Sequence, residues 1–184
     1  TNIFIKNMDC LDTYRQVERD YFRSQGLSLS EELPGSTTVI VSELPRKEFL
    51  VEIEAFGLAS NNHNVWPLEF YPGDRNRSGS VRAGNLIYYS ACHSVGSLEE
   101  QINGGFEKLG IACEKAGSSL NKVIKTNIML TDTNNYSTMR RLETEFYRQN
   151  APDLITNPPV CTYMEVESIE NADTVFQIDA IGVM

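Results

Sequence analysis

Hydrophobic positions along the chain follow two periods, and each period predicts one kind of secondary structure. Apolar residues at every second position predict strands over residues 3–5, 37–44, 49–56, 80–82, 86–91 and 124–130. Spacings of three and four residues predict three amphipathic helices. Their apolar faces carry, in turn, Leu11, Tyr14, Val17, Tyr21 and Phe22; Ile102, Phe106, Leu109 and Cys113; and Tyr136, Met139, Leu142 and Phe146. This mixture of strands and helices predicts an α+β fold.

Short polar motifs mark where the helices begin and end. Asp9 and Asn134 stand where the N-caps of the first and third helices are expected. Ser97 and Glu100 have the spacing of a capping box, so the second helix should begin there. Gly117 is expected to end that helix, because glycine adopts the left-handed conformation of a C-terminal cap.

The chain contains an internal repeat with an offset of 125 residues. The opening triplet Thr1-Asn2-Ile3 recurs at residues 126–128, and the register continues without a gap to Gly57 on Gly182. Of the first 57 residues, 14 are identical to their counterparts, among them Arg15/Arg140, Glu18/Glu143, Leu29/Leu154, Thr37/Thr162, Val41/Val166 and Ile53/Ile178. Both copies therefore predict the same β-α-β-β order of elements.

Only the second copy is preceded by a hairpin, whose turn is Gly84-Asn85, and by a helix. We therefore expect residues 1–59 to be the C-terminal half of a first domain, and 60–79 to be a linker that runs into an edge strand. Residues 80–184 should form the main part of a complete second domain with the order ββ-α-β-α-ββ. A half-domain cannot cover its own sheet and must pack on a neighbour. The chain begins with Thr1 and not with Met, which suggests a piece of a longer polypeptide.

Charge and cysteine content exclude several classes of partner. Sixteen basic residues against 25 acidic ones give a net charge of −9, which disfavours binding to nucleic acid or to an anionic membrane. Four cysteines lie far apart and only two histidines are present, so we expect reduced thiols, an intracellular (cytoplasmic) location and no metal site. No apolar run approaches the ~20 residues of a membrane span.

Several motifs together resemble the RidA (YjgF/YER057c/UK114) family. They comprise the hairpin segment Val81-Arg82-Ala83-Gly84-Asn85-Leu86-Ile87-Tyr88-Tyr89-Ser90, then Glu99-Glu100-Gln101, Ala116-Gly117-Ser118-Ser119-Leu120, Val123-Ile124-Lys125-Thr126 and Leu130-Thr131-Asp132, and in the first copy Leu44-Pro45 and Val51-Glu52-Ile53-Glu54-Ala55. The resemblance implies a chorismate-mutase-like fold, trimers with the helices outside, and clefts between neighbouring domains. It also implies hydrolysis of reactive enamines and imines, while other members are described as endoribonucleases.

The family's deaminases clamp the substrate carboxylate with an arginine just after the proline that opens the penultimate strand, a task that suits a bidentate guanidinium. In this sequence that position is Cys161 in the second copy and Ser36 in the first. The family's acidic residue early in the last strand is Gln177 in the second copy, and only Glu52 of the first copy keeps it. The tyrosine expected before the hairpin falls on Arg77. These departures argue against deaminase chemistry in this chain.

The remaining cleft candidates come from the hairpin and its end. Ser90-Ala91-Cys92 stands where the family usually has Ser-Gly-Gln, with His93 beside it and Arg82 on the preceding strand. Cys161 could be a nucleophile with His93 as its partner, but a small packing cysteine is the commoner role. Arg82 is equally consistent with a solvated strand position, and the glycine pair Gly104-Gly105 indicates close helix–sheet approach.

Tandem, diverged domains of this kind resemble the C-terminal region of eukaryotic, fungal-type diphthine–ammonia ligases. That resemblance implies an ATP-binding domain elsewhere in the parent chain, no cofactor within these residues, and elongation factor 2 as the parent's substrate. Three functions stay open at this point: a non-catalytic assembly, regulatory or ligand-sensing module; a free-standing imine deaminase with an altered substrate; and, least favoured by the charge, a ribonuclease. We expect the sheet face that carries Leu86, Tyr88, Ser90, Val166 and Ile178 to be buried between domains, and the two copies to dock as quasi-equivalent partners.

Overall fold

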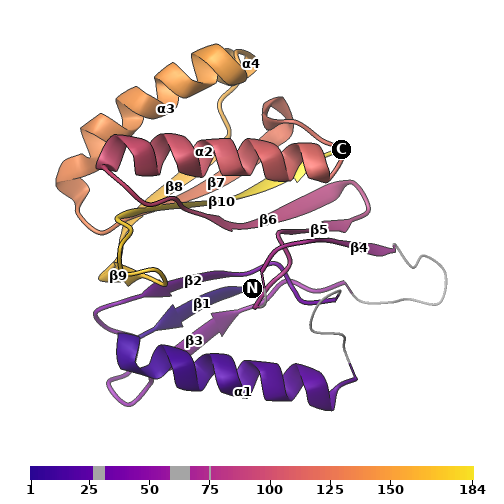
Figure 1. Ribbon diagram of the computed structural model, residues 1–184, viewed down its shortest axis with the longest axis vertical. Coiled ribbons are helices and arrows are strands. Elements are labelled where there is room, and N and C mark those ends of the chain that lie inside the picture. Colours follow the sequence, from indigo (N-terminus) through magenta and orange to yellow (C-terminus); the bar gives the residue numbers. More distant parts are fainter. Residues whose placement is uncertain (27–31, 59–66, 75) are drawn as a thin grey trace.

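The computed structural model describes residues 1–26, 32–58, 67–74 and 76–184, which form two mixed sheets (Figure 1). The first unit contains β1 (Asn2–Ile5), the one-turn η1 (Met8–Cys10), α1 (Leu11–Ser24), β2 (Thr37–Ile40) and β3 (Val51–Glu54). The second unit contains β4 (Leu68–Tyr71), β5 (Ser80–Ala83), β6 (Leu86–Cys92), α2 (Leu98–Lys115), η2 (Leu120–Lys122), β7 (Val123–Leu130), η3 (Thr133–Asn135), α3 (Tyr136–Asn150), α4 (Asp153–Thr156), β8 (Val160–Glu165), β9 (Ser168–Ile169) and β10 (Phe176–Val183).

The two sheets lie face to face, with their helices on the outside (Figure 1). The larger sheet has the strand order β4-β5-β6-β10-β7-β8 and is covered by α2 and α3. The smaller sheet has the order β3-β1-β2-β9 and is covered by α1. The expected α+β class and the ββ-α-β-α-ββ order of the second unit are therefore confirmed, with β4 as the predicted edge strand.

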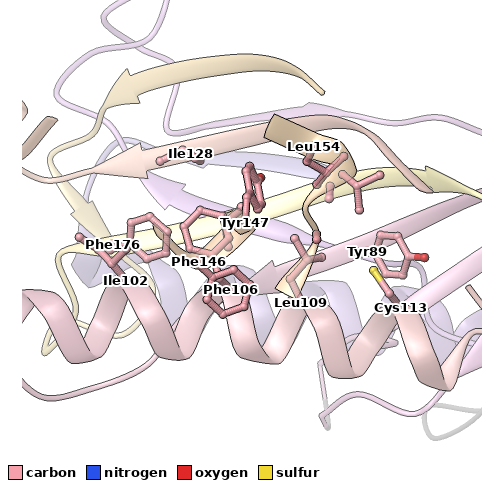
Figure 2. Close-up of a cluster of buried hydrophobic side chains, with 14 of the residues drawn as sticks. Tyr89, Ile102, Phe106, Leu109, Cys113, Ile128, Phe146, Tyr147, Leu154 and Phe176 are labelled. Carbon is pink, nitrogen blue, oxygen red and sulfur yellow. The ribbon is translucent and has the colours of Figure 1, made fainter. Parts of the chain in front are cut away.

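The main core lies between the larger sheet and its two helices (Figure 2). Phe106 of α2 is at its centre, with its ring centroid 5.4 Å from that of Phe146, 5.5 Å from Tyr147 and 5.7 Å from Phe176. Gly105 permits this contact, because a Cβ atom there would lie 2.6 Å from the ring of Phe176. The predicted apolar stripe of α2 is confirmed, since all four of its residues are buried: Ile102, Phe106, Leu109 and Cys113.

A second core fills the space between the two sheets, and it is built from residues 125 positions apart. Three such pairs contribute to it: Phe4 with Met129, Val39 with Met164, and Val41 with Val166. Ile169 of β9 completes this cluster. The inter-sheet contact therefore draws on positions of the two units that correspond at an offset of 125 residues.

Strand pairing follows the same register in both units. In the first unit Asn2 is opposite Thr37 on the parallel strand and Glu54 on the antiparallel one. In the second unit Asn127 is opposite Thr162 and Asp179, at positions shifted by 125. The asparagine amide donates to the facing carboxylate in each case, over 2.6 Å to Glu54 and 2.7 Å to Asp179.

Several details of the predicted elements were wrong. Asp9 and Asn134 lie within the 3-10 turns η1 and η3, and their backbone N–H groups donate to the side chains of the turn caps Asn7 and Asp132. The N-cap positions of α1 and α3 are Cys10 and Asn135, which make no side-chain cap hydrogen bond. The first-copy strands 37–44 and 49–56 are shorter than predicted, at Thr37–Ile40 and Val51–Glu54. Ile178 faces the helices instead of the other unit.

Two elements of the second unit had no counterpart in the prediction. The short helix α4 follows α3, and β9 leaves the second unit to pair with β2 of the first. Residues 60–66 and Arg75 of the predicted linker, and Leu29 of the repeat, lie outside the described residues. Within the described residues, no helix is long and apolar enough to cross a membrane.

Candidate functional site

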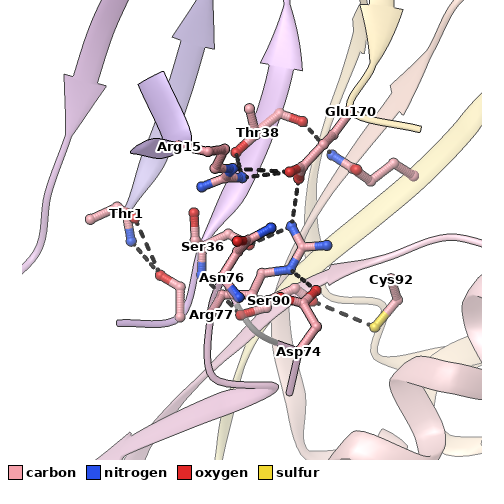
Figure 3. Close-up of polar contacts among 12 residues, drawn as sticks. Thr1, Arg15, Ser36, Thr38, Asp74, Asn76, Arg77, Ser90, Cys92 and Glu170 are labelled. Carbon is pink, nitrogen blue, oxygen red and sulfur yellow. Dashed lines mark hydrogen bonds and ion pairs between the residues drawn. The ribbon is translucent and has the colours of Figure 1, made fainter. Parts of the chain in front are cut away.

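A buried network of charged residues joins the two units at the edge of the smaller sheet (Figure 3). Glu170, just after β9, accepts from Nε and Nη2 of Arg15 at 3.0 and 2.9 Å. Its other carboxylate oxygen accepts from Nη1 of Arg77 at 3.2 Å, so one carboxylate holds two guanidiniums. Arg15 comes from α1 and Arg77 from the segment before β5, so the network draws on both units.

Each arginine has further partners that fix its position. Arg15 also donates to Glu18 over 2.7 Å and to the hydroxyl of Thr38 over 2.6 Å. Arg77 lies 3.3 Å from the carboxylate of Asp74, and both guanidiniums are buried. The second unit contains the counterpart of the first arrangement, because Arg140 donates to Glu143 and to the hydroxyl of Tyr163, which is the residue equivalent to Thr38.

Two of the predicted cleft residues, Ser36 and Ser90, lie directly against each other across the units. The backbone N–H of Ser36 donates to Oγ of Ser90 at 2.9 Å, and that hydroxyl donates to the carbonyl of Ser78 at 2.5 Å. The carbonyl of Ser36 accepts from the backbone of Ala91 at 3.3 Å. Oγ of Ser36 is buried and has no hydrogen-bond partner within the described residues. These serines act as an inter-unit clasp.

Cys92 and His93 lie beside this clasp in their neutral forms. Burial raises the pKa of the Cys92 thiol to about 12, so a thiolate is absent at neutral pH. The thiol lies 3.5 Å from the carbonyl of Ser90. Burial lowers the pKa of His93, and the charges of Arg77 and Lys108 lower it further. A neutral thiol and a neutral imidazole do not form an activated nucleophile pair.

Gln177 occupies the position of the family's acidic residue and lies fully buried between the sheets. Its amide nitrogen is 3.4 Å from the carbonyl oxygen of Thr38, and its own carbonyl oxygen has no partner among the described residues. Neighbouring Asp179 is also buried, and that burial raises the pKa of its carboxyl group.

Three sequence-predicted residues are not brought to this cluster. Cys161 lies on β8 against the core under α3, where burial raises the pKa of its thiol. Arg82 pairs with Glu69 of β4 at 3.2 Å. Glu52 is exposed on β3, which β1 separates from β2 and its cluster. Cys161 therefore has the commoner, packing role, and its alternative role as a nucleophile partnered by His93 is not supported, because β10 and β7 lie between β8 and β6.

Arg15 and Glu170 were not among the predicted site residues. The sequence did contain a signal for Arg15, because Arg15 and Glu18 are identical to their counterparts in the repeat, Arg140 and Glu143. The sequence contained no such signal for Glu170, because Glu170 reaches the cluster only through the crossing of β9 to the other sheet. Among the described residues, no group of three His, Cys, Asp or Glu side chains could hold a metal ion.

An apolar cavity of about 270 Å³ lies near this cluster, between the end of the first unit and the β4–β5–β6 face of the second. Phe22 and Phe56 line it from the first unit, and Phe70, Val81 and Tyr88 from the second. The rings of Phe56 and Tyr88 stack with centroids 6.2 Å apart. The expected burial of Tyr88 and Ser90 at the inter-unit face is thus explained by contacts with the first unit.

Comparison with known proteins assigns the second unit to a family. The family model described as endoribonuclease L-PSP matches residues 76–184, which is more than half of the chain. The chain belongs to this Ribonuc_L-PSP family, which is the family that the hairpin motifs indicated.

Two curated relatives are similar to parts of this chain. The mitochondrial protein mmf2 of Schizosaccharomyces pombe is 35% identical over 81 residues, which are 40% of this chain and 61% of that protein. A RutC family protein of Pyrococcus abyssi is 26% identical over 84 residues, or 41% of this chain and 66% of that protein. The chain thus spans less than two thirds of either relative's length.

The solved structures show likeness in fold. A YjgF/YER057c/UK114 family member from Mycobacterium tuberculosis superposes with a TM-score of 0.56 at 19% identity, covering 64% of this chain and all of that one. A YjgF family protein from Neisseria meningitidis gives 0.58 at 17% identity, covering 65% of this chain and 97% of that one.

Proposed function

We propose that this chain is a non-catalytic module of the RidA family, used for assembly, regulation or ligand sensing. One observation carries the proposal: among the described residues of the inter-unit cluster, both buried guanidiniums, those of Arg15 and Arg77, are paired with the chain's own carboxylates and not free to hold a substrate carboxylate. Ser36 and Cys161 occupy the positions of the family's clamping arginine, and Arg15 and Arg77 both bind the chain's own Glu170. The neutral thiol of Cys92 offers no replacement chemistry.

We further propose that residues 1–59 are the back half of a second, tandem copy of the same domain. The support is the gapless repeat, the matching strand registers and the equivalent Arg15–Glu18 and Arg140–Glu143 pairs. On this proposal the two units dock as neighbouring subunits do in the homo-oligomers of the family. The inter-sheet core then corresponds to a subunit interface.

The parent protein that we propose is a diphthine–ammonia ligase of the fungal type. Its ATP site would lie in another domain of the parent, and elongation factor 2 would be its substrate and partner. The support is the resemblance of tandem, arginine-lacking RidA-like domains to the C-terminal region of such ligases. A cytoplasmic location follows from that role, although mmf2 is named as mitochondrial. The full-length gene product tests this proposal, because a nucleotide-binding domain in the parent chain is required.

An assay of imine hydrolysis tests the absence of catalysis. The chain at high concentration is given 2-aminoacrylate, generated in the assay, and the release of pyruvate and ammonia is followed. We expect only the uncatalysed rate, because loss of a charge-assisted bidentate contact removes several kcal/mol of positioning in the transition state. A Cys161→Arg variant provides a matched comparison, and a family member that retains the arginine is the positive control. Turnover comparable to that control would support the alternative function, an imine deaminase with an altered substrate.

A further inference from the structure

The outer face of the first unit exposes large apolar side chains that its repeat partner buries. Val17 and Tyr21 of α1 are 62% and 60% exposed, and Ile53 of β3 is 55% exposed. Their counterparts, 125 residues later, are Leu142, Phe146 and Ile178, and all three are buried in the main core. We call Val17, Tyr21 and Ile53 the bare face of the first unit.

In the second unit, a strand and a helix cover the face that corresponds to the bare face. Strand β6 pairs antiparallel with β10 on the edge away from β7, with Cys92 opposite Ile178. Helix α2 then packs across α3 and β10, where Phe106 contacts the rings of Phe146 and Phe176. A hairpin strand and one amphipathic helix therefore bury every counterpart of the bare face.

The first unit has the same sheet edge and the same apolar face, and neither is covered within the part of the chain that the structure describes. Strand β3 ends its sheet and pairs there only with β1, so its outer edge corresponds to the edge of β10 that binds β6. An unpaired edge beside an apolar face favours the addition of a strand with its own packing helix. Glu52 and Glu54 of β3 point to the opposite face of the sheet, so they do not interrupt the apolar surface.

We propose that the bare face binds a ββα segment of the parent polypeptide, patterned like residues 80–117, as the front half of the first unit. The proposal rests on the tandem-repeat proposal above. The segment adds its second strand antiparallel to β3 and lays the apolar stripe of its helix over Val17, Tyr21 and Ile53. The occupant is specified by its pattern: a hairpin with a Gly-Asn turn, a capping box, and apolar residues at the spacing of Ile102, Phe106 and Leu109.

The chain supplies the probe for a test, because the two copies begin with the same triplet. A fusion that places a second copy of residues 67–125 directly before Thr1 recreates the native Lys125-Thr126 sequence as Lys125-Thr1. We expect hydrogen exchange of the β3 amides (residues 51–54) to slow at least tenfold in the fusion. Binding of an apolar dye should fall several-fold, and the fusion should remain monomeric.

The matched control is the same fusion with Phe106→Asp in the added copy alone, which should exchange and bind dye like the unfused chain. The proposal is overturned if the fusion leaves β3 exchange unchanged, or if fusion and control behave alike. It is also overturned if the unfused chain dimerises and Tyr21→Asp makes it monomeric, since a second copy then occupies the face. Neither hydrogen exchange nor dye binding depends on imine hydrolysis, so the proposal for the bare face and the proposal of a non-catalytic module can fail independently.

Discussion

Removal of the Glu170 carboxylate should destabilise the protein more than removal of any exposed ion pair. In Glu170→Ala, Arg15 loses two hydrogen bonds of 3.0 and 2.9 Å, and Arg77 loses one of 3.2 Å. Removing one partner of a buried ion pair costs about 3–5 kcal/mol, because the remaining charge stays desolvated. Arg15 keeps Glu18, Arg77 keeps Asp74, and the Glu170 side chain is itself 18% exposed. We therefore expect the lower end, about 3 kcal/mol.

Urea unfolding followed by far-ultraviolet circular dichroism measures this free energy, and a thermal melt should show a fall in Tm of about 6–12 °C. The matched control is Glu145→Ala, which breaks the Arg141–Glu145 pair of 3.0 Å between two exposed side chains. That change should cost less than about 0.5 kcal/mol. If Glu170→Ala falls within the range of the control, the network does not hold the units together and the reasoning fails.

Three further changes have expected outcomes. Gly105→Ala should lower the free energy of unfolding by about 1–3 kcal/mol in urea titrations, because the new Cβ meets the Phe176 ring at 2.6 Å; no loss would show that α2 can shift freely. Asp179→Asn should raise the free energy of unfolding near pH 8, since burial raises the pKa of that carboxyl and so penalises its charged form. The gain should shrink as the pH falls below that raised pKa and disappear below the ordinary value of 3.8, where the carboxyl is protonated in both states. A gain that is independent of pH would contradict this. Because the pKa of His93 is lowered in the folded protein, the wild type should lose stability as the pH falls below about 6.5. Between pH 7 and pH 5 the melting temperature of His93→Gln should therefore fall less than that of the wild type. Parallel plots of melting temperature against pH for the two proteins would refute the assignment.

The elements of the second unit were predictable because local patterns decide them. The capping box at Ser97 and the apolar stripe of α2 can each be recognised from residues close together in sequence, and both were confirmed. The clasp of Ser36 on Ser90 was partly predictable, since the resemblance named both residues. The charged network was not, because Arg15 and Glu170 lie 155 positions apart and meet only through the crossing of β9. The exposure of Val17 could not be predicted either, since periodicity identifies an apolar helix face but does not show what covers it.

Strand β9 has a consequence for how the molecule comes apart. Its residues belong to the second unit in sequence, yet Ser168 and Ile169 pair with Ile40 and Val39 of the first unit's sheet. The first unit cannot separate without losing one of its own strands, and the second cannot release that strand without freeing Glu170. Unfolding should therefore be a single cooperative transition, and the slowest-exchanging amides of both sheets should share one opening free energy.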